Sequence, residues 1–209
     1  RIVDRFRVII DKIRYEDLET IAGAISEKRN SPIDKEITHL FHCAWYFKEY
    51  PICDPIPMIL IPEDSFHLIP KVFQPPFLDD KWNYLTFNEL NSSNWPLKSA
   101  VSELFTLMIL RNPFSIAKKF YSIIQQIGNC VREILKTQNK STNYIDIDFD
   151  QLFVLMLLCI FASGLTEILH PMMYSYSFRE FMMDNYQIQF AMSHMEGICT
   201  HIQSINWDE

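Results

Sequence analysis

Apolar residues recur three and four positions apart over most of the chain, which is the spacing of amphipathic helices. In the N-terminal part this pattern predicts helices over residues 1–28 and from Ser31 to about Tyr50. Pro32 supports the start of the second helix, because proline is favoured at the first helical position. We therefore expect residues 1–50 to consist of helices.

The same spacing returns after residue 80. It predicts helices at about 80–90, 96–110, 113–136, 148–164, 165–175, 178–183 and 186–204. The sequence has only 4 Gly, and its long Leu, Ile, Met and Phe segments favour helices over a β fold with many turns. We therefore predict an all-α fold, with a single helical-bundle domain over residues 1–209.

A proline-rich stretch at residues 51–76 interrupts the helices. It holds seven of the 11 prolines, and proline excludes a long helix or a central strand because it fixes φ and lacks the amide donor. The apolar residues between these prolines are too many for a linker. We therefore predict an extended segment over 51–79, packed on the helices, with one or two helical turns around Asp64 to Ile69.

One apolar run is long enough to raise the question of a membrane helix. It extends from Leu152 to Ala162, and Ser163, Gly164 and Glu167 follow it. A helix that spans a bilayer needs about 20 apolar residues, whereas runs of about 10–14 are more typical of buried core helices. We therefore expect a central core helix here and no membrane span.

The charge balance and the cysteines exclude some classes of function. The net charge is -7, whereas nucleic-acid-binding domains usually carry a basic surface, so direct nucleic-acid binding is not expected. The 5 Cys are widely spaced, which is typical of reduced thiols in an intracellular, cytoplasmic protein. The chain begins at Arg1 and not at Met, so we expect it to be a fragment of a longer protein.

Two groups of residues have the chemistry of metal ligands. They are His39, His42, Cys43 and Cys53 in the first half of the chain, and His194, Cys199 and His201 in the last predicted helix. Neither group has the paired spacing of structural zinc sites. No glycine-rich phosphate loop and no nucleophile motif occurs either. We therefore expect no metal and no cofactor, and the chain is not expected to be an enzyme on these grounds.

The order of elements from Arg111 to Ile202 resembles the Vps-nine domain, the exchange-factor module for endosomal Rab GTPases. In that family a Pro and Lys pair opens a helix, and a polar loop and an acid-led apolar helix follow. A segment of methionines or aromatics then leads to a Tyr-led amphipathic helix. The corresponding pieces here are Pro113 with Lys118-Lys119, residues 137–144, FDQLFVLMLLCIFA, MMYSYSFREFM and NYQIQFAMSHMEGICTHI. The resemblance implies a Vps-nine-like helical core within residues 96–206.

In that family an acidic finger at the start of the apolar helix reaches the nucleotide site of the GTPase, where it displaces magnesium and engages the phosphate-loop lysine. Matched in order, the finger Asp falls on Phe149 and the second acid on Asp150. The family's Pro falls on Phe153, its Tyr on Tyr186 and its Thr on Gln189. The second acid is kept, but of the finger, the Pro, the Tyr and the Thr only the Tyr is the same residue in this chain, so the exchange motif is degraded.

Two interpretations of the acids around Phe149 remain open. If the helix starts one residue early or late, Asp148 or Asp150 could take the finger role, although one residue is about 100° of rotation around a helix. The exchange residues would then be Asp148, Asp150, Tyr186 and Gln189. Alternatively, the acids cap the helix, since Asp at a helix start accepts amide hydrogen bonds and stabilises it by about 0.5–2 kcal/mol. Capping is the interpretation that we favour.

A cluster of methionines and aromatics follows the apolar run. Such side chains adapt to partner grooves, although they could also close the core. The candidate partner-binding residues are Met172, Met173, Tyr174, Tyr176, Phe178, Phe181 and Met182. We therefore expect a non-catalytic interaction or scaffold domain that binds another protein in a larger assembly. The alternative is a guanine-nucleotide exchange factor for an endosomal Rab GTPase, with the small GTPase as the partner.

Overall fold

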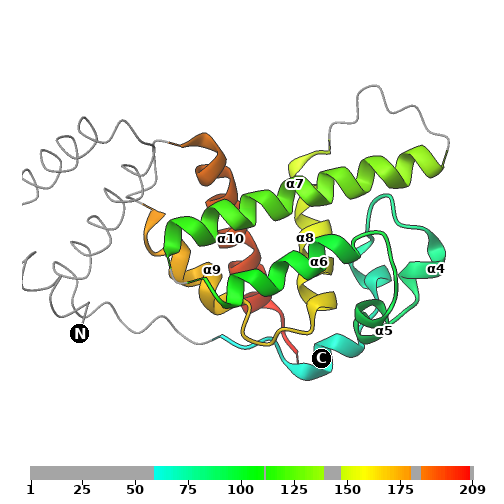
Figure 1. Cartoon of the computed structure of the whole chain (residues 1–209). Coiled ribbons are helices and arrows are strands. Elements are labelled where there is room, and N and C mark those ends of the chain that lie inside the picture. The colour runs from blue at the N-terminus through cyan, green and yellow to red at the C-terminus, as the bar shows by residue number, and fades with distance from the viewer. Residues whose placement is uncertain (1–58, 111, 139–146, 180–184, 208–209) are drawn as a thin grey trace, which may run out of the picture.

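A computed structural model describes residues 59–110, 112–138, 147–179 and 185–207 (Figure 1). These ranges contain helices and no strand, so the all-α prediction is confirmed for the described part of the chain. None of the helices described there has the length and apolar character needed to cross a bilayer. The predictions for residues 1–50 and for the first part of the proline-rich stretch, 51–58, lie outside the described residues.

Four longer helices form the centre of the described structure. They are α7 (Pro113–Thr137), α8 (Phe149–Ser163), α9 (Leu169–Tyr176) and α10 (Tyr186–Ser204). The chain before them forms short helices, which are η1 (Glu63–His67), η2 (Pro70–Phe73), α4 (Asp80–Asn83), α5 (Phe87–Ser92), α6 (Lys98–Leu104) and η3 (Phe105–Met108). In Figure 1, α7 runs across α8 and α10, and both of these helices begin near it.

Local hydrogen bonds start and end the long helices where the sequence pattern predicts. The Asn112 side chain accepts from two amides of the first turn of α7, and Asn185 does the same for α10. Gly164 ends α8 with a φ of 67°, a left-handed conformation that costs glycine little. Three of the four long helices therefore have the predicted bounds within about two residues.

Three predicted helices differ from the observed ones, and the helix predicted at 178–183 lies largely outside the described residues. The helix predicted at 165–175 begins only at Leu169. The helix predicted at 80–90 is divided into α4 and α5, because Thr86 starts a new helix there. Its hydroxyl accepts from the amide of Glu89, and the Glu89 carboxylate accepts from the amide of Thr86. The helix predicted at 96–110 is α-helical only from Lys98 to Leu104 and continues as the 3-10 helix η3.

The central element of the core is α8, and nine consecutive residues of this helix, 155–163, are buried. A helix that is apolar all round has to be enclosed on all sides. Accordingly, α8 is contacted by α5, α6, α7, α10 and η1. The apolar run that raised the membrane question is therefore the middle of a protein core.

The described part of the proline-rich stretch packs against the C-terminal end of α8. The amide of Ile61 donates to the carbonyl of Thr166 at 2.9 Å. Two 3-10 helices, η1 and η2, follow, and Phe66 of η1 is buried as part of the core. The ring of Phe73 stacks on that of Phe161 in α8, with 5.3 Å between the ring centroids. This stretch therefore covers one end of the central helix.

Candidate functional site

The first turns of α8 and α10 meet in a cluster of rings around Phe190. The ring of Phe149, the first residue of α8, meets Phe190 edge-on with 6.3 Å between centroids. Tyr186, one turn before Phe190 in α10, stacks on the same ring at 6.4 Å. From α7, Tyr121 meets it edge-on at 6.5 Å. We call these four residues, Tyr121, Phe149, Tyr186 and Phe190, the aromatic patch.

Two rings of the aromatic patch face solvent and two form its base. The exposed fraction is 47% for Phe149 and 76% for Tyr186, whereas Tyr121 and Phe190 are half-buried. Exposed large aromatic side chains that lie close together are typical of protein interfaces, where Tyr, Trp and Phe are enriched. The aromatic patch is therefore the strongest candidate binding surface in the described residues.

His194 lies fully buried beneath the aromatic patch. Its ring is 4.1 Å from that of Phe149 and 4.5 Å from that of Phe190, measured between centroids. Its Nδ1 lies 3.0 Å from the carbonyl oxygen of Phe190, whereas its Nε2 has no hydrogen-bond partner among the described residues. Burial lowers the pKa of His194, and the bond to the Phe190 carbonyl opposes this in part. The neutral ring, with Nδ1–H donating to Phe190, is therefore the form that fits this site.

The two acids beside Phe149 have different roles in the structure. Asp148 is the N-cap of α8, as the capping interpretation predicts. Its carboxylate accepts from the amide of Gln151 at 2.7 Å, and the Gln151 side chain accepts from the amide of Asp148 at 3.3 Å. Asp150 lies in the first turn and is exposed. The cap leaves Phe149 as the first helical residue, at the position that the resemblance assigns to the finger acid.

The structure brings together two of the positions to which the resemblance assigns a role. Phe149 and Tyr186 both contact Phe190, although they lie 37 positions apart in the sequence. Gln189 is exposed on the first turn of α10. Phe153, at the position of the family's proline, packs on α10 with its ring 5.7 Å from that of His201. Phe149 and Tyr186 therefore lie on one surface, whereas Phe153 lies beside the last turn of α10.

Comparisons with protein-family models, with curated proteins and with solved structures found no match. Function is therefore inferred from the residues and the geometry of this surface.

The methionine and aromatic cluster predicted to bind a partner lies largely in α9, between α7 and α10. Met172 and Phe178 are buried, and the other described members are half-buried. Those half-buried members are Met173, Tyr174 and Tyr176. Phe181 and Met182 lie outside the described residues. Met172 and Phe178 therefore belong to the core, and the other described members pack against it, while partner binding by the half-buried members stays a prediction.

The described part of the chain contains no group of three or more His, Cys, Asp or Glu that could hold a metal ion. Of the candidates in α10, Cys199 is buried, and burial raises the pKa of its thiol to about 12. A thiol with that pKa carries almost no thiolate at neutral pH and is a poor nucleophile. His201 is exposed. The other candidates, His39, His42, Cys43 and Cys53, lie outside the described residues.

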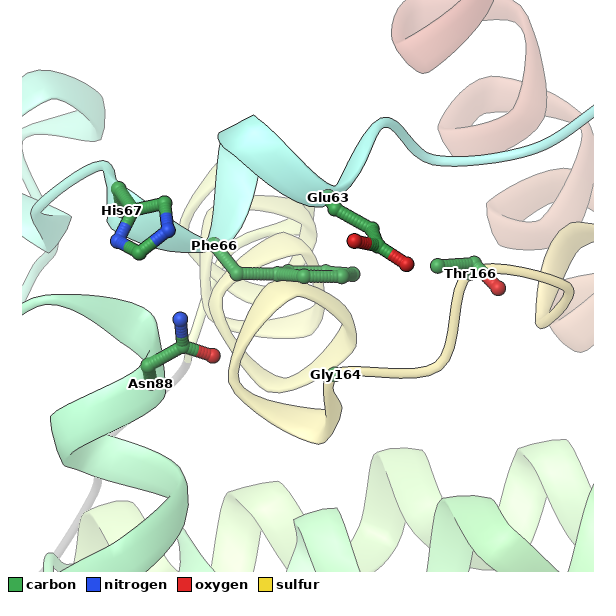
Figure 2. A pocket seen from close by; sticks show the side chains of 6 residues that line it. All are labelled: Glu63, Phe66, His67, Asn88, Gly164 and Thr166. Atoms are coloured by element: carbon green, nitrogen blue, oxygen red, sulfur yellow. The ribbon is translucent and has the colours of Figure 1, made fainter.

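A pocket of about 260 Å³ lies at the opposite end of α8 (Figure 2). It is lined by Glu63, Phe66, His67, Asn88, Gly164 and Thr166. In Figure 2 the Glu63 carboxylate points towards Thr166, and Phe66 separates these two from His67 and Asn88. Glu63 and His67 are exposed residues of the short 3-10 helix η1. The pocket offers hydrogen-bonding groups but no buried acid, base or nucleophile, so it is a weaker candidate than the aromatic patch.

Sequence reasoning missed two residues of the candidate site, Tyr121 and Phe190, and considered His194 only as a possible metal ligand. A signal for Phe190 was present, because Tyr186, Phe190 and His194 recur every fourth residue and so share one face of α10. Tyr121 belongs to α7 and reaches the site only through the packing of α7 on α10. Its contribution required the tertiary structure.

Proposed function

We propose that this chain is a non-catalytic protein-interaction domain with a Vps-nine-like arrangement of helices, and that it binds another protein through the aromatic patch. The observation that carries this proposal is the position of Phe149. Where the resemblance requires a carboxylate that enters a nucleotide site, this chain has a half-exposed phenyl ring packed on Phe190 and His194.

The chemistry of the patch supports protein binding over catalysis. Rings that leave water on binding contribute much of the affinity of protein interfaces, and such anchors cluster at the interface centre. Nucleotide exchange would instead use a carboxylate at the start of α8 that is free to reach the nucleotide site. The carboxylate of Asp148 accepts a hydrogen bond from the first turn of α8, and its removal from the cap would cost about 1 kcal/mol.

The cysteines support a reducing compartment. Cys130, Cys159 and Cys199 are buried and free, and burial raises the pKa of Cys159 well above its usual value. Buried free thiols of this kind are typical of intracellular proteins. We therefore propose that the domain works in the cytoplasm, as part of a larger assembly.

The alternative function is nucleotide exchange on an endosomal Rab GTPase. One observation favours it, which is that Asp150 is exposed directly after Phe149. A carboxylate is therefore present in the first turn of α8, close to the surface that carries Tyr186. In this alternative, Asp150 takes the finger role.

A nucleotide-release assay separates the two functions. The chain is added to a panel of Rab GTPases loaded with fluorescent GDP, and we expect no acceleration of release. Acceleration that disappears in Asp150→Asn but persists in Asp64→Asn would establish the alternative. Asp64 is a suitable control because it is an exposed acid in η1, at the other end of the core.

The proposed role is tested by affinity capture with two patch variants, Phe149→Ala and Tyr186→Ala. We expect a bound protein to be lost in both and retained in Phe105→Ala. Phe105 is a matched control, because its ring is 45% exposed and lies in η3, outside the patch. A partner that binds both patch variants as well as the unmodified chain would contradict the proposal.

A further inference from the structure

Four other accessible rings of the described structure have a cation of this chain over them, whereas the two exposed rings of the aromatic patch do not. Elsewhere Lys71 lies over Tyr84, Lys81 over Trp82, Lys118 over Phe114 and Arg179 over Tyr176, at 4.4–4.9 Å from the ring centroids. In the described residues, no Lys or Arg lies over Phe149 or Tyr186, the two most exposed rings of the patch. These two ring faces are open to a cation from outside the described structure.

The charges around the patch are negative. Neither α8, with 15 residues, nor α10, with 19, contains a Lys or an Arg. The two residues that flank Phe149 in the chain, Asp148 and Asp150, are both exposed acids. A carboxylate has about four acceptor positions, and the cap of α8 uses one of those of Asp148. The aromatic patch therefore offers ring faces, and the two acids that flank Phe149 offer carboxylate oxygens.

The lysines of α7 that come closest to Tyr121 in sequence are engaged elsewhere. Lys118 lies over the ring of Phe114, and Lys119 pairs with Glu103 of α6. Neither of these contacts brings the ammonium group to the patch. The negative charge at the start of α8 is therefore not balanced by these neighbours.

We propose that the aromatic patch recognises an arginine side chain of a partner protein, with the guanidinium stacked on Phe149 or Tyr186 and paired with Asp148 or Asp150. This inference rests on the proposed function and specifies the chemistry of the partner. Arginine fits better than lysine because its planar, weakly hydrated guanidinium stacks on rings and donates two parallel hydrogen bonds to one carboxylate.

The test uses the full chain and a fluorescent hexapeptide of alternating Leu and Arg. A peptide with citrulline in place of arginine has nearly the same shape without the charge, and a third peptide carries lysine. Binding is followed by fluorescence anisotropy at two salt concentrations. We expect the arginine peptide to bind about tenfold more tightly than the citrulline peptide, and more tightly than the lysine peptide.

Variants of the chain localise the binding. Phe149→Ala and Tyr186→Ala should each weaken binding of the arginine peptide about fivefold, and Asp150→Asn about threefold with a smaller salt dependence. Three matched controls should change it little, namely Phe105→Ala, Tyr84→Ala and Asp64→Asn. Circular dichroism and thermal melting check that each variant is folded. Tyr186→Ala is the safer of the two ring variants, since 76% of this side chain is exposed.

Several outcomes would overturn the inference. If Asp64→Asn weakens binding of the arginine peptide as much as Asp150→Asn does, the basic peptide is attracted to an acidic chain in general and not to the aromatic patch. Equal binding of the arginine and citrulline peptides would remove the role of the charge. If sedimentation shows a dimer that Tyr186→Ala dissociates, a second copy of this chain covers the patch and the proposed arginine is not needed.

A cross-linking experiment distinguishes failure of this inference from failure of the proposed function. A photoreactive phenylalanine analogue replaces Phe149 in cells, and the cross-linked segment of the bound protein is sequenced by mass spectrometry. We expect an arginine in that segment. A segment without arginine would overturn the inference and leave the interaction role intact. A partner that is bound without any cross-link from Phe149 would contradict both.

Discussion

The two ends of α8 are made from the same residue types and have opposite surroundings. At its start, Phe149 is half-exposed and packs on two residues of α10. At its end, Phe161 is fully buried, with Phe73, Phe87 and Trp207 around it. We call the end at Phe161 the closed end and the end at Phe149 the open end. The phenylalanine at the closed end stabilises the fold, whereas much of the ring at the open end faces solvent. The residue type alone does not tell these roles apart.

The same substitution at both ends of α8 should give the largest difference. We expect Phe161→Ala to lower the free energy of unfolding by about 3–5 kcal/mol, because it removes a buried ring and leaves a cavity. Phe149→Ala should lower it by about 1 kcal/mol or less, since much of that ring already faces water. Urea denaturation measures both. Similar losses in the two variants would contradict the difference between the ends.

A pair of glycine substitutions tests the closed end next. Gly164→Ala should lower the free energy of unfolding by about 1–2 kcal/mol, because alanine is strained at the φ of 67° that this position adopts. An added Cβ would also meet the Asn91 side chain at 3.4 Å. Gly128→Ala, inside α7, should raise it by up to about 1 kcal/mol, since an added Cβ there has room and alanine favours helices. Opposite signs in thermal melts would confirm that the turn after α8 needs glycine.

The cap at the open end should have a smaller effect. Asp148→Ala removes the acceptor for the Gln151 amide and should cost about 1 kcal/mol of stability, whereas Asp148→Asn keeps an acceptor and should cost less. Asp150→Ala, at a position without a capping role, serves as the control. If Asp148→Asn is as unstable as Asp148→Ala, the charge and not the hydrogen bond holds the start of the helix.

The buried histidine should make the open end sensitive to pH, with the smallest effect. The pKa of His194 in the folded protein lies below its ordinary value of 6.5, so the unfolded chain binds more protons between the two pKa values. Stability should therefore fall as the pH drops through 6.5, by less than about 1.4 kcal/mol for each pH unit. His194→Gln should show a flatter dependence between pH 7 and pH 5 in urea denaturation. An unchanged slope would show that other groups carry the effect.

Sequence patterns predict three of the four long helices closely and the candidate binding surface only in part. The bounds of α7 and α10 follow from Asn112, Pro113 and Asn185, whose effects are local hydrogen bonds and a fixed φ. Residue type alone predicts Met172 and Phe178 as partner-binding residues, but both are buried in the structure. Met172 lies in α9, which packs on α7 and α10, and such packing depends on residues far away in the sequence.

The all-α class of the described residues, the caps of α8 and the burial of its apolar run can be predicted from the order of residues, since these depend on spacing and on groups within a few residues. The meeting of Tyr121, Phe149, Tyr186 and Phe190 above His194 cannot, because it depends on how α7, α8 and α10 pack. A helix's own hydrogen bonds close within four residues, whereas the position of one helix against another follows from the packing of all their faces together.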